Sequence, residues 1–242
     1  MKDAGAVRML VLGMCVAAAA VAAAHAQEAN ESPAIRDLLW VWGNPEMAEA
    51  GPHTLAAFAQ AAPAERAKLL DVPNIAMGGN GLPRDEVPAM ALTAEVAHAP
   101  RLVWEIGCDD ENGGPPFEYG KTVARVADVG KAYPQVEGVL LDDMSSQQID
   151  RGLKPEHIAA LRALLRSQCP QIKLWGVLYT MNYGIANIDD YIRELDVISL
   201  WVWHATDLGK VEESVAYLEE RFPEKPIVLG LYLYDYGNNK PM

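Results

Sequence analysis

Residues 136–143 read VEGVLLDD, and this stretch decides the fold. The apolar residues at 139–141 follow one another with no polar residue between them. Such runs are typical of strands covered on both faces, as in parallel sheets flanked by helices. The run ends on Asp142 and Asp143, so acidic side chains stand directly where the predicted strand ends.

Similar strand-like runs recur along the chain, and segments of helical period separate them. The predicted strands cover 38–43, 74–78, 101–106, 138–142, 173–179, 197–203 and 226–232, and the predicted helices cover 54–70, 86–98, 119–133, 155–167, 188–195 and 211–221. A strand followed by a helix recurs at roughly 30 residues, which is too long for a hairpin connection. The strands are therefore predicted to pair in parallel.

Two parallel architectures fit this order, an open doubly wound sheet and a closed (β/α)8 TIM-type barrel. No G-x-G-x-x-G motif follows the first strand, which removes the main indication of a dinucleotide-binding open sheet. Seven regular β/α units in one domain favour the TIM-type barrel. The eighth unit is missing from the sequence, and an unclosed sheet would leave strand edges unpaired. We therefore expect a fragment of a longer protein, with an atypical seven-strand barrel as the alternative.

The N-terminal segment has the three parts of a secretory signal peptide. A short basic region precedes an apolar run at 9–24, which is too short to span a bilayer comfortably. The run closes on a small-x-small motif at 24–26. The sequence thus predicts a signal peptide over 1–26, a barrel domain over 27–242, and a periplasmic or secreted protein.

The three cysteines bear on export and on disulfide formation. Cys15 raises the alternative of a lipoprotein signal, although Met14 precedes it where a small residue is needed. Cys108 and Cys169 remain after cleavage, and the predicted topology puts them at opposite ends of the sheet. No bridge between them is expected.

The composition limits the classes of partner. A net charge of −13 argues against nucleic acid and against an anionic membrane, because both bind clustered Lys and Arg. No second apolar segment has the length of a membrane helix. The chain contains no phosphate loop and no H-E-x-x-H or C-x-x-C motif, so no cofactor and no bound metal are expected.

The candidate catalytic residues lie at the C-terminal ends of the predicted strands, where barrels of this class build their sites. Gly138 and Asp142 have the same parity on the strand, and a small Gly suits a crowded interior, so Asp142 is predicted to face inward and Asp143 to lie at the loop edge. Glu105 ends the preceding strand, close enough for the two carboxyl groups to divide acid and base roles. The structural alternatives are an Asp that caps the following loop, and a salt bridge from Glu105 to Arg101 or Lys173.

Aromatic and polar residues at the same rim are candidate ligand contacts. Trp rings near a barrel mouth suit the C–H face of a sugar, whereas Trp40 and Trp201, deeper in their strands, are predicted to be core. The predicted substrate-binding residues are Trp42, Asn44, Tyr179, Trp203, His204, Tyr232 and Asp235.

The order of elements and the segment 136–143 resemble a TIM barrel of the glycoside-hydrolase type, in which an acidic residue and a Gly lead into apolar residues that end in carboxylates. The chitinase-like group is one comparison, but its signature closes on a Glu where Met144 stands here. The resemblance implies an exported enzyme acting on a glycan or glycoside, with Asp142 as the central carboxylate and Glu105 or Asp143 as its partner. The alternatives are a non-catalytic carbohydrate-binding barrel and a metal-dependent lyase or hydrolase that uses Glu105, Asp142 and His204.

Overall fold

The computed structural model describes residues 34–43, 61–79, 81–110, 113–144, 149–232, 234–235, 238 and 240–241. The chain divides into two units, Met1–Leu38 and Leu39–Met242. The first unit contributes the short 3-10 helix η1 (Ile35–Leu38), and the second contains the sheet. The predicted signal peptide, 1–26, lies outside the described residues.

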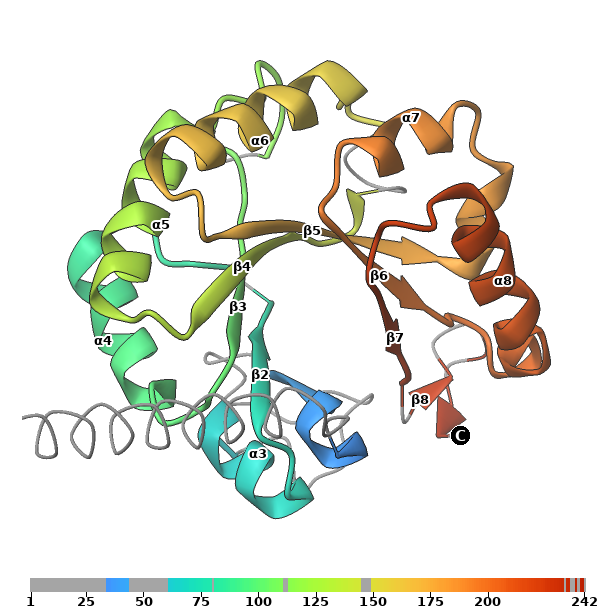
Figure 1. Ribbon diagram of the computed structural model, residues 1–242, viewed down its shortest axis with the longest axis horizontal. Coiled ribbons are helices and arrows are strands. Elements are labelled where there is room, and N and C mark those ends of the chain that lie inside the picture. Colours follow the sequence, from blue (N-terminus) through green and yellow to red (C-terminus); the bar gives the residue numbers. More distant parts are fainter. Residues whose placement is uncertain are drawn as a thin grey trace, which may run out of the picture. The chain divides into compact units, whose positions relative to one another are not determined.

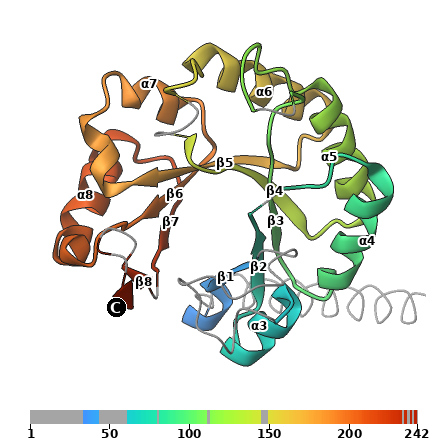
Figure 2. The ribbon, with the colours of Figure 1, turned by 180° about the vertical axis from the view of Figure 1, so that it is seen from behind.

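Seven parallel strands form one curved sheet whose spatial order is the order of the sequence (Figures 1 and 2). They are β1 (Trp40–Gly43), β2 (Asn74–Met77), β3 (Leu102–Glu105), β4 (Val136–Leu141), β5 (Lys173–Tyr179), β6 (Val197–Trp201) and β7 (Ile227–Gly230). Among the described residues β1 and β7 do not pair with each other. A separate antiparallel pair, β8 (Tyr234–Asp235) and β9 (Lys240–Pro241), follows β7.

Helices connect the strands and cover the outer face of the curved sheet (Figure 1). They are α3 (Pro63–Leu70), α4 (Glu86–Val96), α5 (Gly120–Ala132), α6 (Pro155–Gln168), α7 (Ile188–Arg193) and α8 (Val211–Arg221), with 3-10 turns η3 (Thr180–Gly184) and η4 (Ala205–Lys210). Helix α8 has Glu212 and Glu213 in its first turn and Arg221 in its last, a charge order that suits the helix dipole. The α/β TIM-type architecture with seven β/α units is confirmed.

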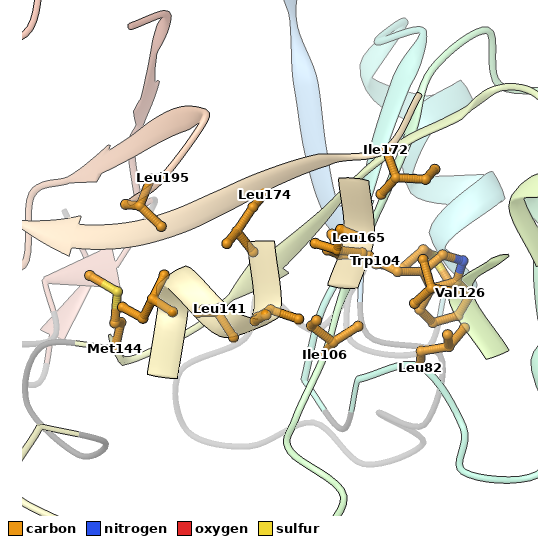
Figure 3. Packing of buried hydrophobic residues seen from close by; sticks show 14 of the residues in the cluster. Leu82, Trp104, Ile106, Val126, Leu141, Met144, Leu165, Ile172, Leu174 and Leu195 are labelled. Carbon is orange, nitrogen blue, oxygen red and sulfur yellow. The ribbon is translucent and has the colours of Figure 1, made fainter. Parts of the chain in front are cut away.

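The inner strands β2–β6 are mostly buried on both faces, as their apolar sequences predict, whereas the edge strands β1 and β7 are partly exposed. The outer face packs against the helices, and Leu141, Leu174 and Leu165 belong to that core (Figure 3). The inner face forms a second cluster around Val103, Leu140 and the inward side chains of β5. Two opposed cores therefore fix which residue of each strand faces inward.

Glycines on inward-facing positions make room for the tryptophans of the inner cluster. A Cβ on Gly138 would lie 2.5 Å from the indole Nε1 of Trp175. A Cβ on Gly78 or Gly230 would likewise lie 2.1 Å from the ring of Trp42 or Trp201, respectively. Small residues on some strands thus accommodate large rings from others, which is how a barrel interior reaches close packing.

Cys108 and Cys169 are both buried and carry free thiols. None of the helices in the described part of the chain is long and apolar enough to cross a membrane.

Candidate active site at the C-terminal ends of the strands

Glu105 and Asp142 stand at the carboxyl ends of two neighbouring strands. Glu105 is the last residue of β3 and lies opposite Leu140 in the β3–β4 register. Leu140 belongs to the inner cluster, so Asp142, two residues further on, shares its inward face. The site is therefore at the mouth of the curved sheet, where parallel α/β folds place their chemistry.

Glu105 is held by the backbone of the neighbouring strand end rather than by a cation. The N–H of Gly79 donates to its Oε2 at 2.5 Å, and Gly79 has a φ of 98°, which favours glycine. Within the described residues no Lys or Arg forms a salt bridge with Glu105; Arg101 instead makes two bonds to Glu137, of 2.7 and 2.6 Å. Burial, together with the charges of Asp142 and Asp143, raises the pKa of Glu105 to about 8, against the opposing Gly79 bond.

Asp142 is the second carboxyl group with a raised pKa. Burial and the charge of Asp143 raise the pKa of Asp142 to about 6, while the Asp143 N–H, which donates to its Oδ1 at 2.8 Å, opposes the shift. Burial and the neighbouring carboxylates thus push the two pKa values apart, and that of Glu105 is the higher. Two carboxyl groups whose pKa values are pushed apart are the arrangement that an acid and base pair requires.

Asp143 lies beside this pair and contacts the end of β5. The hydroxyl of Tyr179 donates to Asp143 Oδ1 at 2.8 Å, and the hydroxyl of Tyr232 lies 3.5 Å from that of Tyr179. The buried side chain of Asn182 accepts a bond of 2.6 Å from the Tyr179 backbone N–H. Residues from β4, β5 and the end of β7 therefore meet at one point.

Aromatic rings border the carboxyl groups. Trp42 packs edge-on against Trp201 with ring centroids 5.5 Å apart, and Trp201 lies 4.7 Å from the ring of Tyr232. Trp203 packs edge-on against Tyr179 at 5.2 Å. Trp42, Trp201, Trp203 and Tyr232 are all half-buried.

The remaining predicted site residues are held in other ways. Asp235 is buried, and hydrogen bonds from Asn238, the side-chain amide foremost, lower the pKa of its carboxyl group. His204 is half-buried and directly precedes η4, where its backbone carbonyl accepts a bond from the Asp207 N–H. Asn44 lies outside the described residues.

The described residues form neither a three-residue metal site nor the closing Glu of the chitinase-like signature. In the part of the chain that the structure describes, no three His, Cys, Asp or Glu side chains come together as a metal site. Met144 is fully buried in the outer core, so no carboxylate takes the place of the Glu that closes the chitinase-like signature.

The contact of Gly79 with Glu105 was not predicted from the sequence. Gly79 follows a strand end, and its positive φ is a conformation that only the tertiary structure shows. Trp201, which was predicted to be core, packs against the inner cluster and lies edge-on to Trp42. The i, i+2 spacing of the tryptophans indicated the shared face, whereas their depth in the barrel depended on the register of the strands.

The comparisons with known proteins concern the fold. The sequence matches no protein-family model and no curated protein. Among solved structures, the chain is similar to Bacteroides uniformis beta-glucuronidase, with 11% identity, a TM-score of 0.54, and coverage of 79% of this chain and 24% of that one. The shared feature is the fold. The Bacillus cereus spore cortex-lytic enzyme SleL is also similar, with 14% identity, a TM-score of 0.48, and coverage of 81% of this chain and 50% of that one. A putative beta-galactosidase from Bacteroides fragilis has 10% identity, a TM-score of 0.48, and coverage of 78% of this chain and 27% of that one. The chain thus spans between about a quarter and half of the length of these proteins.

Proposed function

We propose that this chain is the catalytic barrel of an exported protein that hydrolyses a glycan or a glycoside. Glu105 is the general acid that protonates the leaving oxygen. Asp142 is the carboxylate that attacks the sugar or activates water on it. The observation that carries this proposal is the pair of half-buried carboxyl groups at the ends of the neighbouring strands β3 and β4, whose pKa values are raised to different extents.

The surroundings of the pair suit a sugar. Half-buried rings of Trp42, Trp203 and Tyr232 offer apolar surface with polar edges, which matches the alternating C–H and hydroxyl groups of a pyranose. The segment 1–26 supports export, and the acidic composition favours an uncharged ligand over nucleic acid. Similarity in fold to a beta-glucuronidase is compatible with this reading, although one barrel fold hosts many reactions.

Two substitutions at the carboxyl pair test the proposal. The wild type is assayed on a panel of 4-methylumbelliferyl glycosides and on the corresponding unactivated disaccharides. Asp142→Asn should abolish turnover on both kinds of substrate while leaving the fold intact. Glu105→Gln should cost about 10²–10⁴-fold on the disaccharide and less on the activated glycoside, because the methylumbelliferone leaving group needs little protonation.

Glu137→Gln is the matched control, because this Glu precedes Gly138 on β4 and pairs with Arg101 away from the mouth. Its turnover should equal that of the wild type. Full activity of Asp142→Asn would contradict the assignment. A wild type that binds oligosaccharides but cleaves none of them would favour the non-catalytic carbohydrate-binding barrel.

A further inference from the structure

Tyr179 occupies a position at the mouth that a ligand cannot use as a stacking surface. Its side chain is only 3% exposed, although it was predicted to be a sugar platform. Its ring packs against Trp203, and its backbone N–H is fixed by Asn182. The one chemically active group that Tyr179 presents to the site is its hydroxyl, which donates to Asp143.

Asp143 adopts a backbone conformation that needs support. Its φ of 45° is left-handed, a conformation that is unfavourable for a non-glycine residue, although Asp tolerates it better than most residues. In this conformation its N–H donates to Asp142 Oδ1 at 2.8 Å. The bond from Tyr179 to the Asp143 carboxylate therefore holds the residue whose backbone fixes the carboxyl group of Asp142.

The direction of the hydroxyl bonds is determined by counting hydrogens. A tyrosine hydroxyl carries one hydrogen, and that of Tyr179 goes to Asp143. In the 3.5 Å contact between the two hydroxyls, Tyr232 must therefore be the donor and Tyr179 the acceptor. The resulting chain runs from Tyr232 through Tyr179 and Asp143 to Asp142, and it connects the ends of three strands.

We propose that Tyr179 is a positioning residue, whose hydroxyl holds Asp143 in the conformation that orients the carboxyl group of Asp142 for reaction. The inference rests on the proposed function of Asp142. It replaces the stacking role of Tyr179 with a role in the geometry of the carboxyl groups. The bond joins a hydroxyl to a carboxylate and is part-buried, and hydrogen bonds to charged groups orient their partners more strongly than neutral ones do.

Tyr179→Phe tests the inference, because it removes the hydroxyl and keeps the ring on Trp203. The measurement is the hydrogen-exchange rate of the Asp143 amide, followed by NMR on the free protein. Loss of the hydroxyl should raise this rate at least about tenfold, since the amide then leaves Asp142 more often. The matched control is Tyr191→Phe, which removes a buried hydroxyl that donates to the Leu153 carbonyl at 2.9 Å, and it should leave the rate unchanged.

A double-mutant cycle tests whether the Tyr179 hydroxyl acts on turnover through Asp143. Asp143→Ala removes the acceptor of the Tyr179 hydroxyl. Asp143→Ala and Tyr179→Phe should each lower kcat about 10–100-fold and leave KM within about twofold of the wild-type value. Asp143→Ala also removes a charge that raises the pKa of Asp142, but in that background Tyr179→Phe has no bond to Asp143 left to break. The double variant should therefore lose little more kcat than Asp143→Ala alone. Fully additive losses would overturn the proposal.

Amide exchange separates this inference from the proposed function. An Asp143 amide that exchanges equally fast in the wild type and in folded Tyr179→Phe overturns the positioning role, whatever the enzyme does. Retained turnover in Asp142→Asn overturns the proposed function, whereas the exchange measurement still decides whether Tyr179 holds Asp143.

Discussion

Replacement of Gly138 by Ala tests the packing that places Asp142 at the mouth. The new Cβ would lie 2.5 Å from Trp175 Nε1, 2.8 Å from its Cδ1 and 3.1 Å from the Lys173 carbonyl. An ordinary carbon–nitrogen contact is about 3.5–4 Å, so the overlap with the ring is about 1 Å. Trp175 cannot simply move aside, because it is 4% exposed and packs edge-on against Trp40 at 5.2 Å.

The expected cost follows from two opposing terms. Overpacking of this kind lowers the free energy of unfolding by about 1–3 kcal/mol. Replacing glycine also reduces the conformational entropy of the unfolded chain, which raises the free energy of unfolding by about 0.4–1 kcal/mol. Gly138→Ala should therefore lower the free energy of unfolding by about 1–2 kcal/mol, or the Tm by about 2–8 °C for a domain of this size. Urea unfolding followed by tryptophan fluorescence, together with a thermal melt, measures both.

Two further variants serve as a control and as a test of the clash with Trp175. Gly209→Ala, whose Cβ would meet nothing within 4 Å, should be neutral or slightly stabilising. Adding Trp175→Phe to Gly138→Ala should recover part of the loss, because the smaller ring removes the atoms that clash. A Gly138→Ala variant as stable as the wild type, or strictly additive effects with Trp175→Phe, would refute the packing described for the barrel interior.

The remaining predictions concern pH and a helix cap. If Glu105 acts in its protonated form and Asp142 in its ionised form, the plot of kcat/KM against pH should be bell-shaped. It should fall above pH about 8, where Glu105 loses its proton, and below pH about 6, where Asp142 gains one. A profile that is flat between pH 5 and 9 would contradict both roles. Asp109 caps α5 by accepting from the Lys121 and Thr122 amides at 2.9 and 2.8 Å, and although burial opposes ionisation, these bonds lower its pKa. Asp109→Ala should lower the free energy of unfolding, measured in urea at pH 7, by about 0.5–2 kcal/mol. The control is Asp128→Ala, at an exposed position of α5, which should lower it less. Equal effects of the two substitutions would show that the cap contributes nothing.

Local pattern was sufficient for most of the fold. The strand at Lys173–Tyr179 and the helix at Val211–Arg221 have the bounds that periodicity predicts, because both depend on neighbours within a few residues. Alternation along β4 also indicated that Asp142 faces the same side as Gly138 and Leu140. The parallel topology followed from the length of the connections.

The sequence by itself determined the alternation of strands and helices, the acidic and aromatic character of the rim, and the positions of the carboxyl groups at strand ends. Only the tertiary structure decided which groups meet there: Gly79 bonds Glu105 across 26 positions in the chain, and Tyr179 bonds Asp143 across 36. It also decided that Tyr179 is buried, whereas Trp42 and Trp203 are half-buried. The physical reason is that burial and charge act through space, so a pKa, a hydrogen-bond partner or the depth of a ring depends on the register and curvature of the sheet, which no single segment encodes.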